Sequence, residues 1–306
     1  MEKLILGCGY LGRRVANAWL AEGHNVSALT RSTTRAEELS KAGIRPIIGD
    51  ICEPSTLSSL PAADTVLFAV GYDRASGRSQ QEVYVEGLGN VLRSIVPGAR
   101  HLIYISSTSV YGQAAGEWVD EDSECRPVQP GGECCLAAEK QVFACFPAKA
   151  AVPTRSPRAN VLRLSGIYGP GRLLARVESL RAGEILAGRG DAWLNLIHVE
   201  DAVQAVLACE RRGQAGRIYL VTDDQPVQRA EYYGLLAALT DAPPPRFAPE
   251  ISPSRGSGGI NKRCRNQRLR EELKVALTYR TINDGLPPTL GVPARPAHPH
   301  PTFPAE

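Results

Sequence analysis

The chain has 306 residues, of which 43% are hydrophobic and 22% are charged, and its formal net charge is +3. These are ordinary globular values, and the length suffices for one large domain or two smaller ones. They give no reason to expect a nucleic-acid partner, and no apolar run is long enough to cross a bilayer.

The first predicted element is a strand that leads directly into a glycine-rich loop. Residues 3–6 are a short apolar run, the loop reads Gly7-Cys8-Gly9-Tyr10-Leu11-Gly12, and residues 13–22 are typical of a helix. Strand, glycine loop and helix in this order form the context that a dinucleotide fingerprint requires.

Each residue of this loop has an expected use. Gly7 permits the tight turn, Gly9 lets the backbone approach a pyrophosphate, and Gly12 lets the helix pack close to the strand. Unpaired N–H groups at the helix start favour phosphates. We therefore predict a dinucleotide site that includes Tyr10 and Leu11. The alternative is a tight strand-to-helix turn without a ligand.

The second strand, residues 25–30, bears on which dinucleotide is bound. NAD sites place Asp or Glu about 20 residues past the glycines, to accept from the ribose 2′-hydroxyl. Here the strand is followed by Arg31-Ser32, with Arg35 one helical turn later. Arginine suits a 2′-phosphate. The sequence thus favours NADP, with NAD as the alternative cofactor, unless Arg31 is only a solvated charge.

Strands and helices alternate through most of the chain. Further strands are predicted at 45–50, 64–71, 101–107, 160–165, 195–199 and 217–221, and helices at 34–42, 80–95, 136–146, 173–182, 200–210, 228–239 and 261–273. Residues 243–259 are predicted to form a loop. The alternation predicts an α/β fold, a Rossmann-type doubly wound parallel sheet.

Eight cysteines are spread along the chain without CxxC pairs or Cys/His spacings. No metal site is therefore expected. Reduced thiols fit a cytoplasmic protein best, and a strand that begins at residue 3 leaves no room for a signal peptide.

Several motifs beyond the glycine loop follow one another in a recognisable order. They are Gly49-Asp50-Ile51, the run from Ile105 to Gly112, the run from Arg163 to Arg172, the run from Ile197 to Ala202, and Asn261-Lys262-Arg263 followed by Leu269. With these segments the chain resembles an extended, atypical short-chain dehydrogenase/reductase of the NAD-dependent epimerase/dehydratase family, over about residues 5 to 280.

The resemblance implies a division of the chain and roles for particular residues. Residues 1–165, with return segments near 195–225, would form the Rossmann core; 166–194 and 226–285 would form a small C-terminal substrate lobe. The tail 287–306 is rich in proline and expected to be disordered. Asp50, followed by Ile51, would bind the adenine amine, Val70-Gly71 would line the cofactor, and Ser107 would hydrogen-bond the reacting substrate oxygen. Alternatively, Ser107 only caps its own backbone.

The family's acid/base pair, a Tyr with a Lys four residues on, is missing. Alignment on Leu136-Ala137-Ala138-Glu139 puts Gly131 at the Tyr position and Cys135 at the Lys position. Tyr111 is the replacement that we name as catalytic, although Tyr-Gly segments more often pack in turns. Other phenol or proton carriers are weaker candidates, because packing or helix-end roles suit them better: Tyr168, Glu133 and His198.

Two functions remain open at this point. One is an atypical oxidoreductase or epimerase that acts on a small carbonyl compound or a nucleotide sugar. The other is a non-catalytic NADP-binding redox sensor or scaffold. A small-molecule substrate is the expected partner, and the resemblance implies that a homodimer is an option; neither nucleic acid nor a membrane is expected.

Overall fold

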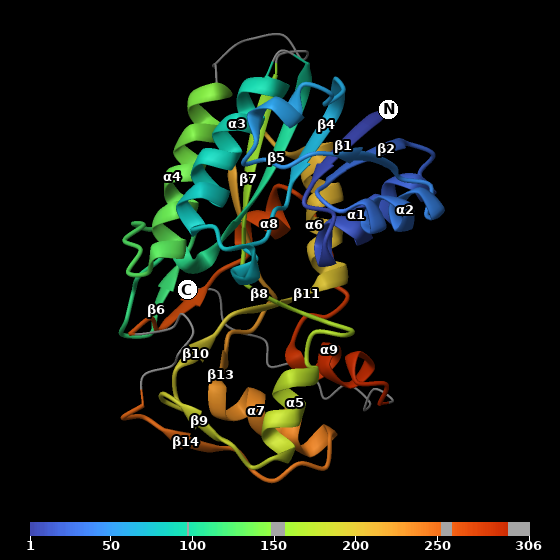
Figure 1. The fold of residues 1–306 in the computed structure, drawn as a ribbon. Helices are drawn as coiled ribbons and strands as arrows, with labels where there is room; N and C mark the ends of the chain where they lie inside the picture. Colours follow the sequence, from blue (N-terminus) through green and yellow to red (C-terminus); the bar gives the residue numbers. More distant parts are fainter. Residues whose placement is uncertain (97, 148–156, 252–258, 293–306) are drawn as a thin grey trace.

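The computed structural model describes residues 1–96, 98–147, 157–251 and 259–292. Its centre is a seven-stranded parallel sheet in the order β12-β7-β5-β4-β1-β2-β3 (Figure 1). Buried apolar residues dominate these strands, as is usual for a sheet covered on both faces. The strands are β1 (Glu2–Leu6), β2 (Asn25–Thr30), β3 (Arg45–Ile48), β4 (Ala63–Phe68), β5 (Ala99–Ser107), β7 (Arg158–Leu164) and β12 (Ile218–Val221).

Helices cover both faces of this sheet, which confirms the predicted doubly wound fold. On one face lie α1 (Tyr10–Ala21), α2 (Thr33–Lys41) and α6 (Val199–Arg212); on the other lie α3 (Gly87–Ile95) and α4 (Pro130–Cys145) (Figure 1). The strand order reverses between β1 and β4. A ligand site is expected there, at the carboxyl ends of the strands.

A smaller lobe lies below those carboxyl ends (Figure 1). The chain passes from the sheet into this lobe through β8 (Gly166–Tyr168), which pairs with β11 (Leu196–His198). Its apolar core includes Val177, Leu236 and Leu286. The lobe contains α5 (Leu174–Arg181), α7 (Arg229–Leu239), α9 (Ile282–Thr289), and the strand pairs β9 (Ile185–Ala187) with β14 (Arg246–Ala248) and β10 (Trp193–Leu194) with β13 (Val227–Gln228).

Near its end the chain returns from the lobe to the sheet. The predicted helix over 261–273 is instead the strand β15 (Lys262–Cys264) followed by the short helix α8 (Gln267–Glu271). β15 pairs with β6 (Glu117–Val119), a partner distant in sequence, and this pairing overrides local preference. Leu269, Leu273, Val275 and Leu277 then pack into the core between α1, α6 and the sheet.

Other differences from the predicted elements are local. α4 begins six residues earlier than expected, with Pro130 at its first position, which proline tolerates. The predicted loop over 243–259 contains β14, and the expected tail starts inside α9, which includes Pro287 and Pro288. Residues 293–306 lie outside the described residues.

Short helices complete the element list. They are η1 (Pro54–Leu57), η2 (Arg74–Ser76), η4 (Thr108–Val110) and a π-helical segment, η3 (Glu82–Glu86), directly before α3. Among the described helices, none has the length and apolar character that a membrane crossing requires.

Candidate dinucleotide and substrate site

The glycine loop between β1 and α1 is pressed against the end of β4. Gly7 has φ +92°, and a Cβ there would lie 2.5 Å from backbone atoms of Ala69. A Cβ on Gly12 would lie 2.4 Å from the carbonyl oxygen of Gly7. In contrast, a Cβ on Gly9 would meet no atom within 4 Å. The loop therefore combines tight packing with one open backbone position, a shape that fits a pyrophosphate at the start of α1.

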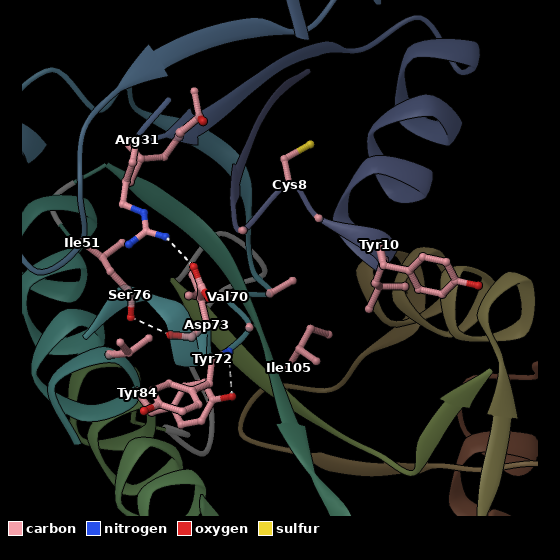
Figure 2. A pocket seen from close by; sticks show the side chains of 18 of the residues that line it. Cys8, Tyr10, Arg31, Ile51, Val70, Tyr72, Asp73, Ser76, Tyr84 and Ile105 are labelled. Atoms are coloured by element: carbon pink, nitrogen blue, oxygen red, sulfur yellow. Dashed lines mark hydrogen bonds and ion pairs between the residues drawn. The ribbon is translucent and has the colours of Figure 1, made fainter. Parts of the chain in front are cut away.

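A cavity of about 750 Å³ opens at the carboxyl ends of the strands, beside this loop (Figure 2). Gly12 lies behind the loop and is not in the cavity wall. The wall contains the other predicted cofactor residues and Ser107: Gly7, Gly9, Tyr10, Leu11, Arg31, Asp50, Ile51, Val70, Gly71 and Ser107. Across the described ranges, no group of three or more His, Cys, Asp or Glu side chains is placed to hold a metal ion.

The end of β2 and the start of α2 bring two arginines to the wall. Arg31 Nη2 lies 3.6 Å from Asp73 Oδ2, and both side chains are exposed (Figure 2). Arg35 donates through Nη2 to the carbonyl oxygen of Cys8 at 3.4 Å. The Ser32 hydroxyl accepts from the Arg35 N–H and caps α2. Two guanidinium groups, rather than a carboxylate, therefore follow β2.

The residues after β3 offer a polar acceptor beside an apolar surface. Asp50 Oδ1 accepts from the Cys52 N–H at 2.9 Å, and Asp50 Oδ2 lies 3.7 Å from Arg78 Nη2. Ile51 is buried and packs against Gly87, where an added Cβ would come within 2.8 Å of the Ile51 side chain. This arrangement suits the polar edge and flat face of an adenine.

Ser107 ends β5, and its side chain both caps a short helix and faces the cavity. Its Oγ accepts from the Ser109 N–H at 3.1 Å and caps η4. The side chain is also half-buried in the cavity wall. Among the described residues, no acceptor takes the Ser107 hydroxyl proton. The capping interaction therefore leaves Ser107 able to donate into the cavity.

Tyr111 does not line the cavity, which corrects its prediction as a catalytic residue. η4 carries the chain past the end of β5, and Tyr111 is fully buried in a separate apolar cluster. Its hydroxyl accepts from Arg163 Nη1 at 2.7 Å, and Arg163 Nη2 forms a buried ion pair with Glu139 Oε2 at 2.7 Å. Burial raises the pKa of the Tyr111 phenol well above its usual range. Tyr111 is a packing residue.

Comparisons with known proteins place this fold and loop in one family. The profile of the NAD dependent epimerase/dehydratase family matches residues 4–222. The chain belongs to this family.

Individual relatives cover most of the chain. Protein YeeZ of Escherichia coli is 27% identical over 84% of this chain and 90% of its own length. The 3-diazoavenalumate denitrifying reductase of a Streptomyces species is 28% identical over 94% of this chain and 99% of its own. A solved structure of a conserved protein of unknown function from Silicibacter pomeroyi is 30% identical, with a TM-score of 0.76, and covers 95% of this chain and 98% of its own.

Within the epimerase/dehydratase family, this chain departs from the expected pattern on α4. A Cβ on Gly131 would lie 3.2 Å from the Gln80 amide, so the Gln80 side chain occupies the space beside the Tyr position. Cys135, at the Lys position, is buried in the cavity wall, and burial raises the pKa of its thiol to about 11. At neutral pH the cavity therefore has an uncharged thiol where the family has a cation.

The weaker replacement candidates do not line the cavity. Glu133 lies exposed in the first turn of α4. Tyr168 is buried, and His198 accepts from the Glu200 N–H at the start of α6. Burial lowers the pKa of His198 to about 4, so this side chain is neutral at physiological pH. Helix capping and packing explain these residues.

Three tyrosines that the sequence analysis did not single out do line the cavity: Tyr72, Tyr84 and Tyr104. Tyr72 directly follows the predicted cofactor residue Gly71, and Tyr104 lies three residues before Ser107 on β5. The positions of these two were therefore readable from the sequence. Tyr84 lies in the π-helical segment η3, and no sequence pattern predicts such a segment there.

Proposed function

We propose that the protein is an NADP(H)-dependent reductase of a small carbonyl compound. The observation that carries this proposal is the extent of the cavity, which continues from the glycine loop to Ser107 and is not filled by side chains there. Its volume of about 750 Å³ lies within the usual range of ligand sites. A protein that only binds a dinucleotide has no need for open space beside the substrate-orienting hydroxyl.

The preference for NADP rests on the two arginines after β2. Arg31 and Arg35 both line the cavity, and a guanidinium binds phosphate through paired hydrogen bonds. Asp73 pairs with Arg31 only across exposed surface, where an ion pair is worth about 1 kcal/mol or less. A 2′-phosphate can therefore displace Asp73 from Arg31 at little cost.

The substrate class follows from the wall around Ser107. Ile105 and Ile167 supply apolar surface, and Ser107 supplies a hydroxyl. A largely apolar molecule with one carbonyl oxygen fits these groups. The Streptomyces relative, which is named as a reductase and aligns over almost its full length, supports reduction as the reaction class.

First, the purified protein is titrated with NADPH and with NADH, and nicotinamide fluorescence reports the binding. Loss of NADPH absorbance is then measured with 3-oxo esters, aldehydes, quinones and, separately, UDP-glucose. We expect tighter binding of NADPH and turnover of a carbonyl compound. Binding without turnover of any compound would favour the redox sensor, and absence of dinucleotide binding would overturn the proposal.

A further inference from the structure

Four phenols line the cavity, and three of them are committed or enclosed. The Tyr10 hydroxyl donates to the carbonyl oxygen of Pro170 at 3.0 Å, and the Tyr72 hydroxyl donates to that of Arg78 at 2.8 Å. Tyr104 is only 1% exposed. Burial, with Cys135 and Glu139 nearby, raises the pKa of Tyr104 well above its usual value. None of these three is placed to give up a proton readily.

Tyr84 differs in how its hydroxyl is bound. The hydroxyl accepts from the Tyr72 backbone N–H at 3.0 Å (Figure 2). Among the residues that the structure describes, none accepts the Tyr84 proton. Tyr84 is half-buried, so the phenol has contact with the cavity. Its proton is therefore free for a bound molecule, and the N–H is placed to stabilise the phenolate that remains.

The backbone of η3 explains how Tyr84 reaches this place. Hydrogen bonds in a π-helix connect residues five apart, and such segments are frequent at functional sites. Across the cavity wall stands α4 with Cys135, at the position of the missing Lys. α4 packs directly against η3, so Cys135 and Tyr84 come from neighbouring elements of the same wall. Tyr84 thus lies in the part of the cavity where the missing pair would act.

We propose that Tyr84 is the proton donor for the reduction, which rests on the proposed function. When bound, the reduced dinucleotide supplies a hydride, with its two electrons, to the carbonyl carbon. The O–H bond of Tyr84 breaks, and its proton goes to the carbonyl oxygen, so that an alcohol forms. The phenolate keeps the hydrogen bond from the Tyr72 N–H and regains a proton from water. Ser107 holds the same oxygen in place.

Several groups tune the Tyr84 phenol. Desolvation by burial raises its pKa, and the Tyr72 N–H opposes that rise. Cys134 and Cys135 from α4 and the Tyr72 phenol also raise it, and Tyr104 from β5 lies nearby. A positively charged nicotinamide ring in the same cavity would lower the pKa, because it favours the phenolate. Binding of NADP⁺ should therefore lower the pKa of Tyr84, and this change can be measured without turnover.

The first test compares Tyr84→Phe with Tyr233→Phe, the loss of one hydroxyl from a half-buried tyrosine on α7 that does not line the cavity. We expect Tyr84→Phe to lower kcat/KM about 100-fold or more, with the Kd for NADPH unchanged within about threefold. Tyr233→Phe should keep kcat/KM within about threefold. Tyr104→Phe tests whether the enclosed phenol of Tyr104, rather than the accessible phenol of Tyr84, donates the proton; we expect it to retain activity.

The second test needs no substrate. Alkaline titration, followed by phenolate absorbance with and without NADP⁺, should show one phenol whose ionisation moves to lower pH on binding. That signal should disappear in Tyr84→Phe and persist in Tyr233→Phe.

The outcomes separate this inference from the proposed function. If Tyr84→Phe binds NADPH and reduces substrate as the unaltered protein does, Tyr84 is not the donor, although the protein remains a reductase. The same conclusion holds if Tyr84→Phe still shows a phenol whose ionisation shifts to lower pH when NADP⁺ binds. If Tyr104→Phe alone loses both signals, the role belongs to Tyr104. If the unaltered protein binds no dinucleotide, both proposals fail together.

Discussion

The two ends of the cavity differ in what gives them their function: the main chain at one end and side chains at the other. At the glycine loop, the shape comes from the main chain: Gly7 and Gly12 allow backbone atoms to touch, and Gly9 leaves a backbone position open. At α4, the chemistry depends on side chains, and Gly131 and Cys135 stand where the family has Tyr and Lys. One end matches the family, and the other does not.

The comparison shows why one function can change without the other. A side chain at Gly7 would collide with β4 and disturb the sheet, so the loop is tied to the fold itself. At Gly131 on α4 the backbone is not in such close contact, and Cys135 contributes one small side chain both to the cavity wall and to a buried cluster. Dinucleotide binding can therefore stay intact while the acid/base groups are replaced.

The largest expected effect comes from Gly7→Ala. A Cβ 2.5 Å from Ala69 and a positive φ together should cost about 2–3 kcal/mol of unfolding free energy, and NADPH affinity should fall about 100-fold or more. Denaturant unfolding and fluorescence titration measure the two quantities. Gly9→Ala is the control, because its Cβ meets nothing in the protein. It should leave stability within about 0.5 kcal/mol yet weaken NADPH binding; unchanged binding would show that the pyrophosphate lies elsewhere.

Ser107→Ala should have the next largest effect, on turnover rather than on cofactor binding. Loss of the hydroxyl that orients the substrate oxygen should lower kcat/KM about 10- to 100-fold, while the Kd for NADPH stays the same. Ser107→Thr keeps an oxygen that can both cap η4 and donate, so it should retain most of the activity. Equal turnover by the serine and alanine forms would reduce Ser107 to a cap.

A smaller effect is expected from Arg31→Asp, which changes the choice of cofactor. NADPH binding should weaken about tenfold, since an exposed charge-assisted contact to a phosphate is worth about 1.5 kcal/mol, the low end for hydrogen bonds to charged groups, and NADH binding should not weaken. Asp73→Asn frees Arg31 from its ion pair and should move the ratio slightly the other way. The same NADPH-to-NADH ratio in all three proteins would remove Arg31 from the cofactor site.

The sheet and the glycine loop were predictable because their signals are local. β2 has the predicted bounds, and the other strands of the sheet differ by a few residues at their ends. In contrast, β15 and β14 have only three residues each, and they exist because a distant strand pairs with them. A single sequence shows no period over three residues, so these strands could not be found.

The candidate site divides in the same way. The residues after β1, β3 and β4 lie in the cavity wall because the ends of parallel strands meet at one edge. Tyr111 was misplaced because η4 turns the chain into the core within four residues of Ser107. Tyr84 was missed because nothing in the local sequence distinguishes the π-helical segment that carries it from the α-helix that follows.

The return of the chain to the sheet also has a consequence for biosynthesis. Leu269, Leu273, Val275 and Leu277 complete the core that Ile5 and Val15 begin. The core on this face of the sheet therefore stays incomplete until the residues after the lobe have left the ribosome. We expect the first 165 residues alone to be unstable, and the nascent chain exposes apolar surface on this face until residue 277 has been made.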